Sequence, residues 1–158
     1  ESAWQTGNAE YWPAIANVMA SIGTPSTLDI FVETLTDNTN AERVAIVKQA
    51  MTNLVNPDLT PKLAELLENP ATENVQLASG NALANMGELE AATTLFDWSA
   101  QVDAEKIGLV KLWFETAMNT TPEFVAYLET NLDSQKFTDP KIKTAISSAL
   151  KNVKSSVE

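Results

Sequence analysis

The sequence predicts an all-α solenoid, in which four helix pairs stack side by side and one further helix closes the array. The main observation is a hydrophobic period of 32 residues that runs through the 158-residue chain. Within each unit the repeated apolar positions are four residues apart, which places them on one face of a helix. No segment alternates apolar and polar residues for long enough to predict a strand. The three apolar rows are Ala14, Ile46, Ala78, Val110 and Ile142; Val18, Ala50, Ala82, Phe114 and Ile146; and Ile22, Leu54, Met86, Met118 and Leu150.

Turn signals divide the chain into nine helices, which we assign to a single repeat domain over residues 1–158. The four repeat units are expected near 9–37, 41–69, 72–101 and 103–132. Their first helices lie near 9–22, 41–55, 72–86 and 103–119, their second helices near 26–37, 60–69, 88–101 and 121–132, and the closing helix near 139–154.

Capping residues predict where these helices begin and end. Gly23 and Gly87 follow first helices at equivalent positions, as glycines do at helix C-termini. Three residue pairs combine a good N-cap with a proline at the first helical position. These pairs are Thr60 with Pro61, Thr121 with Pro122, and Asp139 with Pro140.

The second helices carry an apolar period of their own. One helix alone cannot bury such a stripe, so neighbouring pairs are expected to stack into a continuous core. The three rows are Leu28, Thr60, Ala92 and Phe124; Phe31, Leu63, Leu95 and Tyr127; and Val32, Ala64, Phe96 and Leu128.

The charge of the chain limits its partners. The net charge is −11 and the pI about 4.3. This acidity argues against nucleic acids, whose phosphates need Lys and Arg, and against anionic membranes. It favours basic partners. The longest apolar runs are far too short to span a bilayer.

The chain contains no Cys and no His, so thiol catalysis, disulfides and imidazole chemistry are excluded. No cofactor motif, metal-ligand pattern or catalytic constellation is present, and we expect a protein that is not an enzyme. The absence of Cys, with many Thr and Asn residues, leans toward a bacterial periplasm or exterior, although an acidic cytoplasmic protein fits nearly as well. The chain starts at Glu1 without a signal-peptide pattern, which favours a mature form or a segment of a larger protein.

The third unit carries a resemblance to a known family. Its residues 75–88 read VQLASGNALANMGE, a small-residue-rich helix that ends in Ala-Leu-x-x-Met-Gly. This pattern resembles the HEAT-repeat superfamily, and within it the short repeats of the phycobilisome-lyase type. The resemblance implies a right-handed solenoid of about four HEAT-like helix pairs plus a closing C-terminal helix. The arginine that often begins the first helix of such repeats is present only as Arg43. Tetratricopeptide repeats, the nearest competing fold, have a different period and signature.

One row of the period is neither core nor turn. It places one acidic residue on each second helix, well away from the apolar rows. In HEAT-like arrays the solvent face of the second helices lines the concave side, so the row would form a ladder of carboxylates about 8–10 Å apart. Such a ladder could dock a basic segment of a partner, or it could be the solvated face of an acidic protein. Its members are Glu33, Glu65, Asp97 and Glu129.

Leu112 and Trp113 form the second candidate contact. They occupy slots of the fourth unit that are polar or small in the other units. Trp is frequent in interface hot spots, which suggests an exposed contact. The other interpretation is that the helix is rotated and buries Trp113 against the closing helix.

Together these features predict a non-catalytic protein–protein interaction scaffold, a module of a larger protein or assembly, that binds a basic partner segment on its acidic concave face. The alternative is a helical regulatory or structural domain of a larger enzyme such as a metallopeptidase. Chromophore handling, by analogy with the lyases that name the repeat type, is a third and weaker interpretation. The sequence does not predict the oligomeric state.

Overall fold

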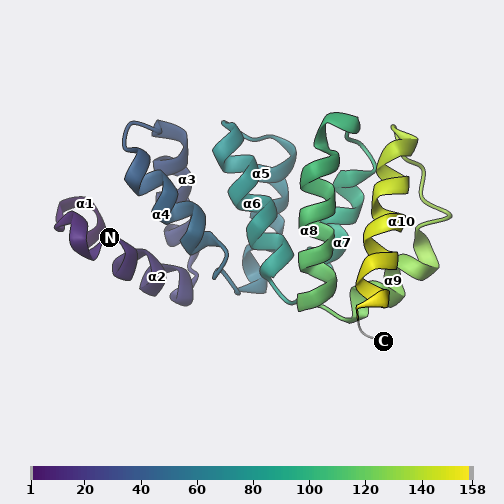
Figure 1. Cartoon of the computed structure of the whole chain (residues 1–158). Helices are drawn as coiled ribbons and strands as arrows, with labels where there is room; N and C mark the ends of the chain where they lie inside the picture. The colour runs from purple at the N-terminus through teal and green to yellow at the C-terminus, as the bar shows by residue number, and fades with distance from the viewer. Residues whose placement is uncertain (1, 157–158) are drawn as a thin grey trace. The chain divides into compact units, whose positions relative to one another are not determined.

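The structure is a computed structural model that describes residues 2–156. Within this range the chain is all-helical, with 78% of the residues in helices and no strand (Figure 1). Contacts divide the chain into two compact units, from Glu1 to Met86 and from Gly87 to Glu158. We call them the N-terminal and the C-terminal unit and describe each by itself. The boundary falls inside the third predicted repeat, so a single domain over 1–158 stays a prediction.

The N-terminal unit consists of helices connected by short turns. The second unit of the period shows why the segments are helical, because Asn40 caps a helix with its side chain and apolar residues then recur on one face. Inside the N-terminal unit α4 packs against both α2 and α6. Helix α3 packs against α4 and α6, and α5 packs against α6. The elements are α1 (Ser2–Thr6), η1 (Ala9–Tyr11), α2 (Trp12–Ile22), α3 (Pro25–Asp37), α4 (Ala41–Met51), η2 (Pro57–Leu59), α5 (Thr60–Glu68) and α6 (Glu73–Asn85), where η denotes a short 3₁₀ helix.

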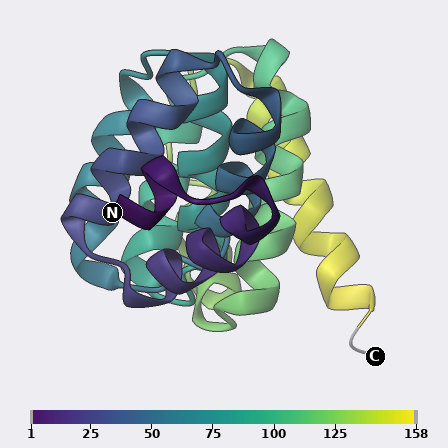
Figure 2. The same cartoon turned by 90° about the vertical axis from the view of Figure 1, so that its left-hand side faces the viewer.

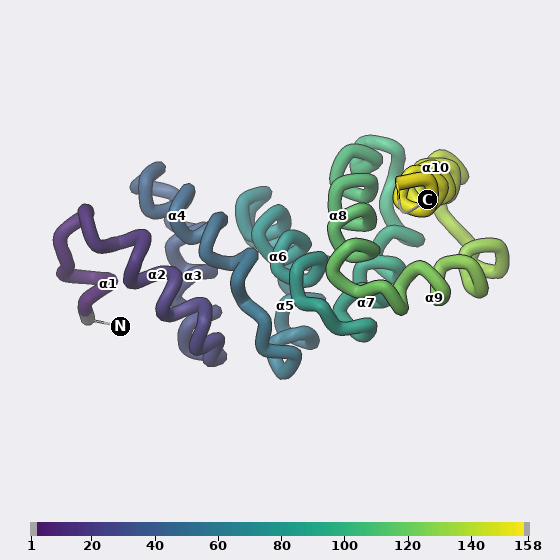
Figure 3. Tube along the Cα trace, turned by 60° about the horizontal axis from the view of Figure 1, so that its bottom comes forward, coloured from purple at the N-terminus to yellow at the C-terminus, as the bar shows by residue number. Residues whose placement is uncertain are grey.

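The C-terminal unit repeats this arrangement. Helix α8 packs against α7, α9 and α10, and α7 also packs against α9. Figure 3 shows α8 and α10 in one row of this unit and α7 and α9 in the other. Its elements are α7 (Leu89–Ser99), η3 (Ala104–Lys106), α8 (Ile107–Thr120), α9 (Glu123–Asn131) and α10 (Pro140–Ser155). Among residues 2–156, none of the helices combines the length and the hydropathy that a bilayer-spanning segment requires.

All nine predicted helices are present, with small changes at their ends. Helix α4, the third predicted helix, ends at Met51 rather than near residue 55, because the chain turns at Thr52 and Asn53. Helix α1 was not predicted. It is only five residues long, too short to show a period, and yet its Trp4 is almost completely buried.

The apolar rows are buried as predicted in α6 and α8, but the prediction is wrong for α2. Val18 and Ile22 are 60% and 64% exposed, and Ala14 is exposed too. Helix α2 instead buries Ala16, Met19 and Ala20. It lies beside α1 and η1 at the start of the unit, so its neighbours differ from those of α4 and α6 and its buried face turns with them.

The caps were predicted with mixed success. Gly23 and Gly87 adopt positive φ angles of 60° and 78° after their helices, which confirms both C-terminal caps. Asp139 caps α10 by accepting a hydrogen bond from the Lys141 amide at 2.9 Å. The other two predicted N-caps are wrong. Helix α5 includes Thr60 because a 3₁₀ turn precedes it, and Pro122, without a side-chain bond, stands at the N-cap of α9.

Candidate functional site

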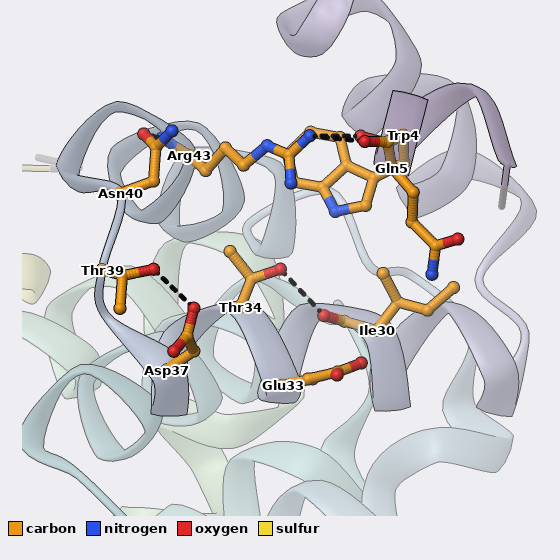
Figure 4. A pocket seen from close by; sticks show the side chains of 9 residues that line it. All are labelled: Trp4, Gln5, Ile30, Glu33, Thr34, Asp37, Thr39, Asn40 and Arg43. Atoms are coloured by element: carbon orange, nitrogen blue, oxygen red, sulfur yellow. Dashed lines mark hydrogen bonds between the residues drawn. The ribbon is translucent and has the colours of Figure 1, made fainter. Parts of the chain in front are cut away.

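The N-terminal unit contains a cavity of about 180 Å³ between α3, α1 and the start of α4 (Figure 4). Ile30, Glu33, Thr34 and Asp37 form one side of it. The last three follow the first by three, four and seven residues, so α3 presents all of them on a single face. This face is distinct from the one that packs into the core, which contributes Phe31 and other residues.

The opposite side of the cavity is built by α1 and by Arg43 of α4. The Arg43 Nη2 donates hydrogen bonds to the Trp4 carbonyl at 2.7 Å and to the Gln5 carbonyl at 3.3 Å. Its guanidinium carbon also lies 5.1 Å from the centroid of the Trp4 ring and 4.3 Å from that of Trp12. Arg43 therefore holds α1 in place by hydrogen bonds and by cation–π contacts.

The polar groups of the cavity are arranged around two carboxylates. Asp37 accepts a hydrogen bond from the Thr39 hydroxyl at 2.6 Å, and the Thr34 hydroxyl donates to the Ile30 carbonyl at 3.0 Å. Glu33, one turn before Asp37, is exposed, and its carboxylate makes no hydrogen bond or ion pair with the described residues. The chain's only arginine lines the same cavity but is directed at backbone carbonyls. Neither carboxylate therefore has a cationic partner within the described chain.

The four acidic residues of the predicted row are all exposed, but their surroundings differ. In the N-terminal unit Glu65 forms an ion pair with Lys62 at 2.9 Å, whereas Glu33 has none. In the C-terminal unit Glu129 pairs with Lys154, and Asp97 has no ion pair with the described residues. Half of the row is therefore already neutralised by lysines of the chain, and the pairs are solvent-exposed.

The two residues of the second candidate contact differ in exposure. Trp113 is only 1% exposed and packs against Trp98 of α7, with their ring centroids 5.1 Å apart. It cannot serve as an exposed contact, because the buried face of α8 includes Trp113 beside the predicted core residues Val110 and Phe114. Leu112 is 54% exposed, so it remains an accessible apolar side chain.

Most of the cavity residues other than Glu33 were missed at the level of sequence. Trp4 and Arg43 are 39 residues apart and carry no spacing signal that would bring them together. The face of Ile30, Glu33 and Asp37 could have been found, because the three positions share one side of a predicted helix. In residues 2–156, no group of acidic side chains is arranged to hold a metal ion.

The cavity has the volume of a single side chain rather than that of a drug-sized ligand. Pockets for drug-sized ligands and cofactors measure about 300–1,000 Å³, whereas a cavity of about 150 Å³ accommodates one benzene. The cavity here has about 180 Å³, so it can take one extended side chain.

Comparisons with protein-family models, with characterised proteins and with solved structures found no match to the chain.

Proposed function

We propose that this protein is a non-catalytic interaction scaffold of HEAT-like helix pairs that binds a basic segment of a partner protein. The observation that carries the proposal is the pair of carboxylates, Glu33 and Asp37, that line one cavity without a cationic partner in the described chain. An ammonium or guanidinium group of the partner would bind between them, and the stem of its side chain would lie along Ile30.

The charge of the whole chain supports the same class of partner. At a net charge of −11 the protein attracts basic segments over distance and accelerates their encounter, with a dependence on ionic strength. Exposed Asp97, which has no ion pair among the described residues, supplies a further carboxylate on the second-helix row.

The packing within each unit supports the repeat architecture of the proposal. In the N-terminal unit α2, α4 and α6 pack successively, and in the C-terminal unit α8 and α10 do so. These helices are the first members of the 32-residue units and the closing helix. We propose that the units continue into a right-handed solenoid, which a measured structure of the whole chain would test directly.

Peptide binding tests the proposed site. A labelled eight-residue oligolysine peptide is titrated with protein at low salt, and its fluorescence anisotropy is followed. The cavity variant carries Glu33→Gln with Asp37→Asn. The matched control carries Glu68→Gln with Asp58→Asn, two exposed carboxylates of the same unit outside the cavity. Both variants lose the same charge, so general attraction by the acidic chain weakens equally in the two.

We expect the cavity variant to bind the peptide several-fold more weakly than the control, because an ion pair at an exposed carboxylate contributes about 0.2–1 kcal/mol. Equal losses in both variants would mean that only net charge attracts the peptide, and the proposed site would then be wrong. Circular dichroism of each variant verifies that helicity is unchanged.

A further inference from the structure

Helix α2 exposes an apolar face that no described part of its unit covers. Tyr11, the last residue of η1, and Val18 and Ile22 of α2 are 58%, 60% and 64% exposed, and Ile15 is partly exposed between them. Figure 2 shows α1 and α2 at the end of the N-terminal unit that faces the viewer. Isolated exposed apolar residues are ordinary, but a continuous stripe along one helix marks an interaction surface.

The stripe is also free of charge. From residue 11 to residue 28 the chain contains no Asp, Glu, Lys or Arg, although 20% of all its residues are charged. Two molecules with a net charge of −11 repel each other over most of their surface. When two copies approach each other through α2, the stripes do not repel, because neither stripe carries an acidic side chain.

The spacing of the stripe makes it complementary to itself. Tyr11, Ile15, Val18 and Ile22 are separated by four, three and four residues, as on the seam of a coiled coil. This order is the same when it is read backwards. Two copies placed antiparallel would therefore oppose Tyr11 to Ile22 and Ile15 to Val18, and a two-fold axis between the copies repeats both contacts.

We propose that two copies of this protein associate through α2, packed antiparallel along the stripe of Tyr11, Ile15, Val18 and Ile22. Ala14, which is exposed beside the stripe, is small enough to let the two helices approach closely. Val55 adds an apolar residue near the end of the stripe. It is 57% exposed, and Asn56, the next residue, donates a hydrogen bond from its side chain to the Gly23 carbonyl at 2.9 Å.

The dimer is weak and depends on salt. A standard protein interface buries about 800 Å² per partner, more than one stripe of about three helical turns supplies. A dissociation constant on the order of 100 µM is therefore expected. Added salt screens the repulsion between the two acidic molecules and tightens the dimer, opposite to its effect on the binding of a basic peptide.

Sedimentation equilibrium of the intact protein from about 10 µM to 1 mM, concentrations chosen around the expected constant, tests the association. The average mass should rise from 17.1 kDa toward twice that value, and more steeply in 0.5 M than in 0.05 M NaCl. Val18→Glu should weaken the dimer at least tenfold. Leu112→Glu is the matched control, since Leu112 is similarly exposed but lies on α8, and should leave the association unchanged. A monomer at every concentration, or equal losses in both variants, would overturn the proposal.

Cysteine cross-linking tests the antiparallel arrangement separately, because the chain has no cysteine of its own. Ile15→Cys and Val18→Cys proteins are oxidised alone and as an equal mixture. The mixture should form disulfide-linked dimers faster than either protein alone, because residue 15 of one copy faces residue 18 of the other. Faster cross-linking of Val18→Cys with itself would contradict the antiparallel register and would indicate a parallel pair of α2 helices instead.

Discussion

Replacing Arg43 by Met should loosen α1 and lower the stability of the N-terminal unit. Met retains an unbranched apolar stem but removes the charge and the donors. The substitution abolishes the hydrogen bonds from Nη2 to the Trp4 carbonyl at 2.7 Å and to the Gln5 carbonyl at 3.3 Å. It also abolishes the contacts of the guanidinium with the rings of Trp4 and Trp12. A five-residue helix is not stable by itself, so these contacts decide how firmly α1 is held.

The magnitude follows from the same contacts. The short charged hydrogen bond contributes about 1.5–3 kcal/mol and the longer one less. The two ring contacts add about 0.5–1 kcal/mol each, since Arg43 is only partly buried. The sulfur of Met regains about 0.3–1.5 kcal/mol against the aromatic rings. The net loss is therefore about 2–5 kcal/mol.

Hydrogen exchange and urea unfolding measure the two consequences. The amide of Gly7, which donates to the Ala3 carbonyl at 2.9 Å, should exchange at least tenfold faster in the variant. Acrylamide should quench tryptophan fluorescence more strongly, because Trp4 is 2% exposed in the folded protein. Lys48→Met is the control, since Lys48 is a cation of the same helix with only a 3.4 Å contact to Asn74. The reasoning is refuted if Arg43→Met costs no more stability than Lys48→Met.

Three further substitutions test local features of the fold by urea unfolding. Gly23→Ala should cost about 1–2 kcal/mol more than Gly87→Ala, because both residues have positive φ but only at Gly23 would a Cβ atom crowd its neighbours, at 3.2 and 3.3 Å. The reverse order would contradict this. Asp139→Ala should cost about 2–3 kcal/mol, because this carboxylate caps α10 and also accepts from the Ala104 amide at 3.1 Å. Asp103→Ala, which removes one turn cap at 2.9 Å, should cost only about 1 kcal/mol, and equal losses would exclude the double role. Thr60→Val should stabilise by about 1 kcal/mol, because the buried Thr60 hydroxyl has no hydrogen-bond partner among the described residues. Thr60→Ser retains the hydroxyl and should destabilise instead; a destabilised Val variant would show that the hydroxyl is satisfied in solution.

The positions of the helices could be predicted because local chemistry specifies them. Apolar residues at helical spacing, glycines at C-termini and prolines in first turns depend on residues close in the sequence. The extra helix α1 could not be predicted in this way. The position of α1 depends on the burial of Trp4 and on hydrogen bonds from Arg43, which lies far along the chain. Thr60 failed as a cap because a 3₁₀ turn directly before it extends the helical path by one residue.

The period predicted which positions repeat, but burial depends on what lies beside each helix. Met86 and Leu54 are buried in the row that also contains Ile22, which is 64% exposed. The three residues occupy equivalent slots, but α2 lies at the start of the unit, where it packs against α1 and η1 as well as α4. An exposed apolar row at such an end is therefore the expected consequence of a regular pattern beside an irregular neighbour, and it is the feature on which the proposed dimer depends.

The acidic row shows the same distinction between a pattern and its surroundings. The helical wheel correctly placed all four carboxylates at exposed positions. It could also have indicated the pair of Lys62 and Glu65, which are three residues apart on one helix. It could not indicate that Lys154 reaches Glu129 from α10, or that Arg43 turns away from Glu33 toward the carbonyls of α1. Equivalent carboxylates therefore differ in their capacity to bind a cation, and in the N-terminal unit Glu33, beside Asp37, is the member of the row that a basic partner should depend on most.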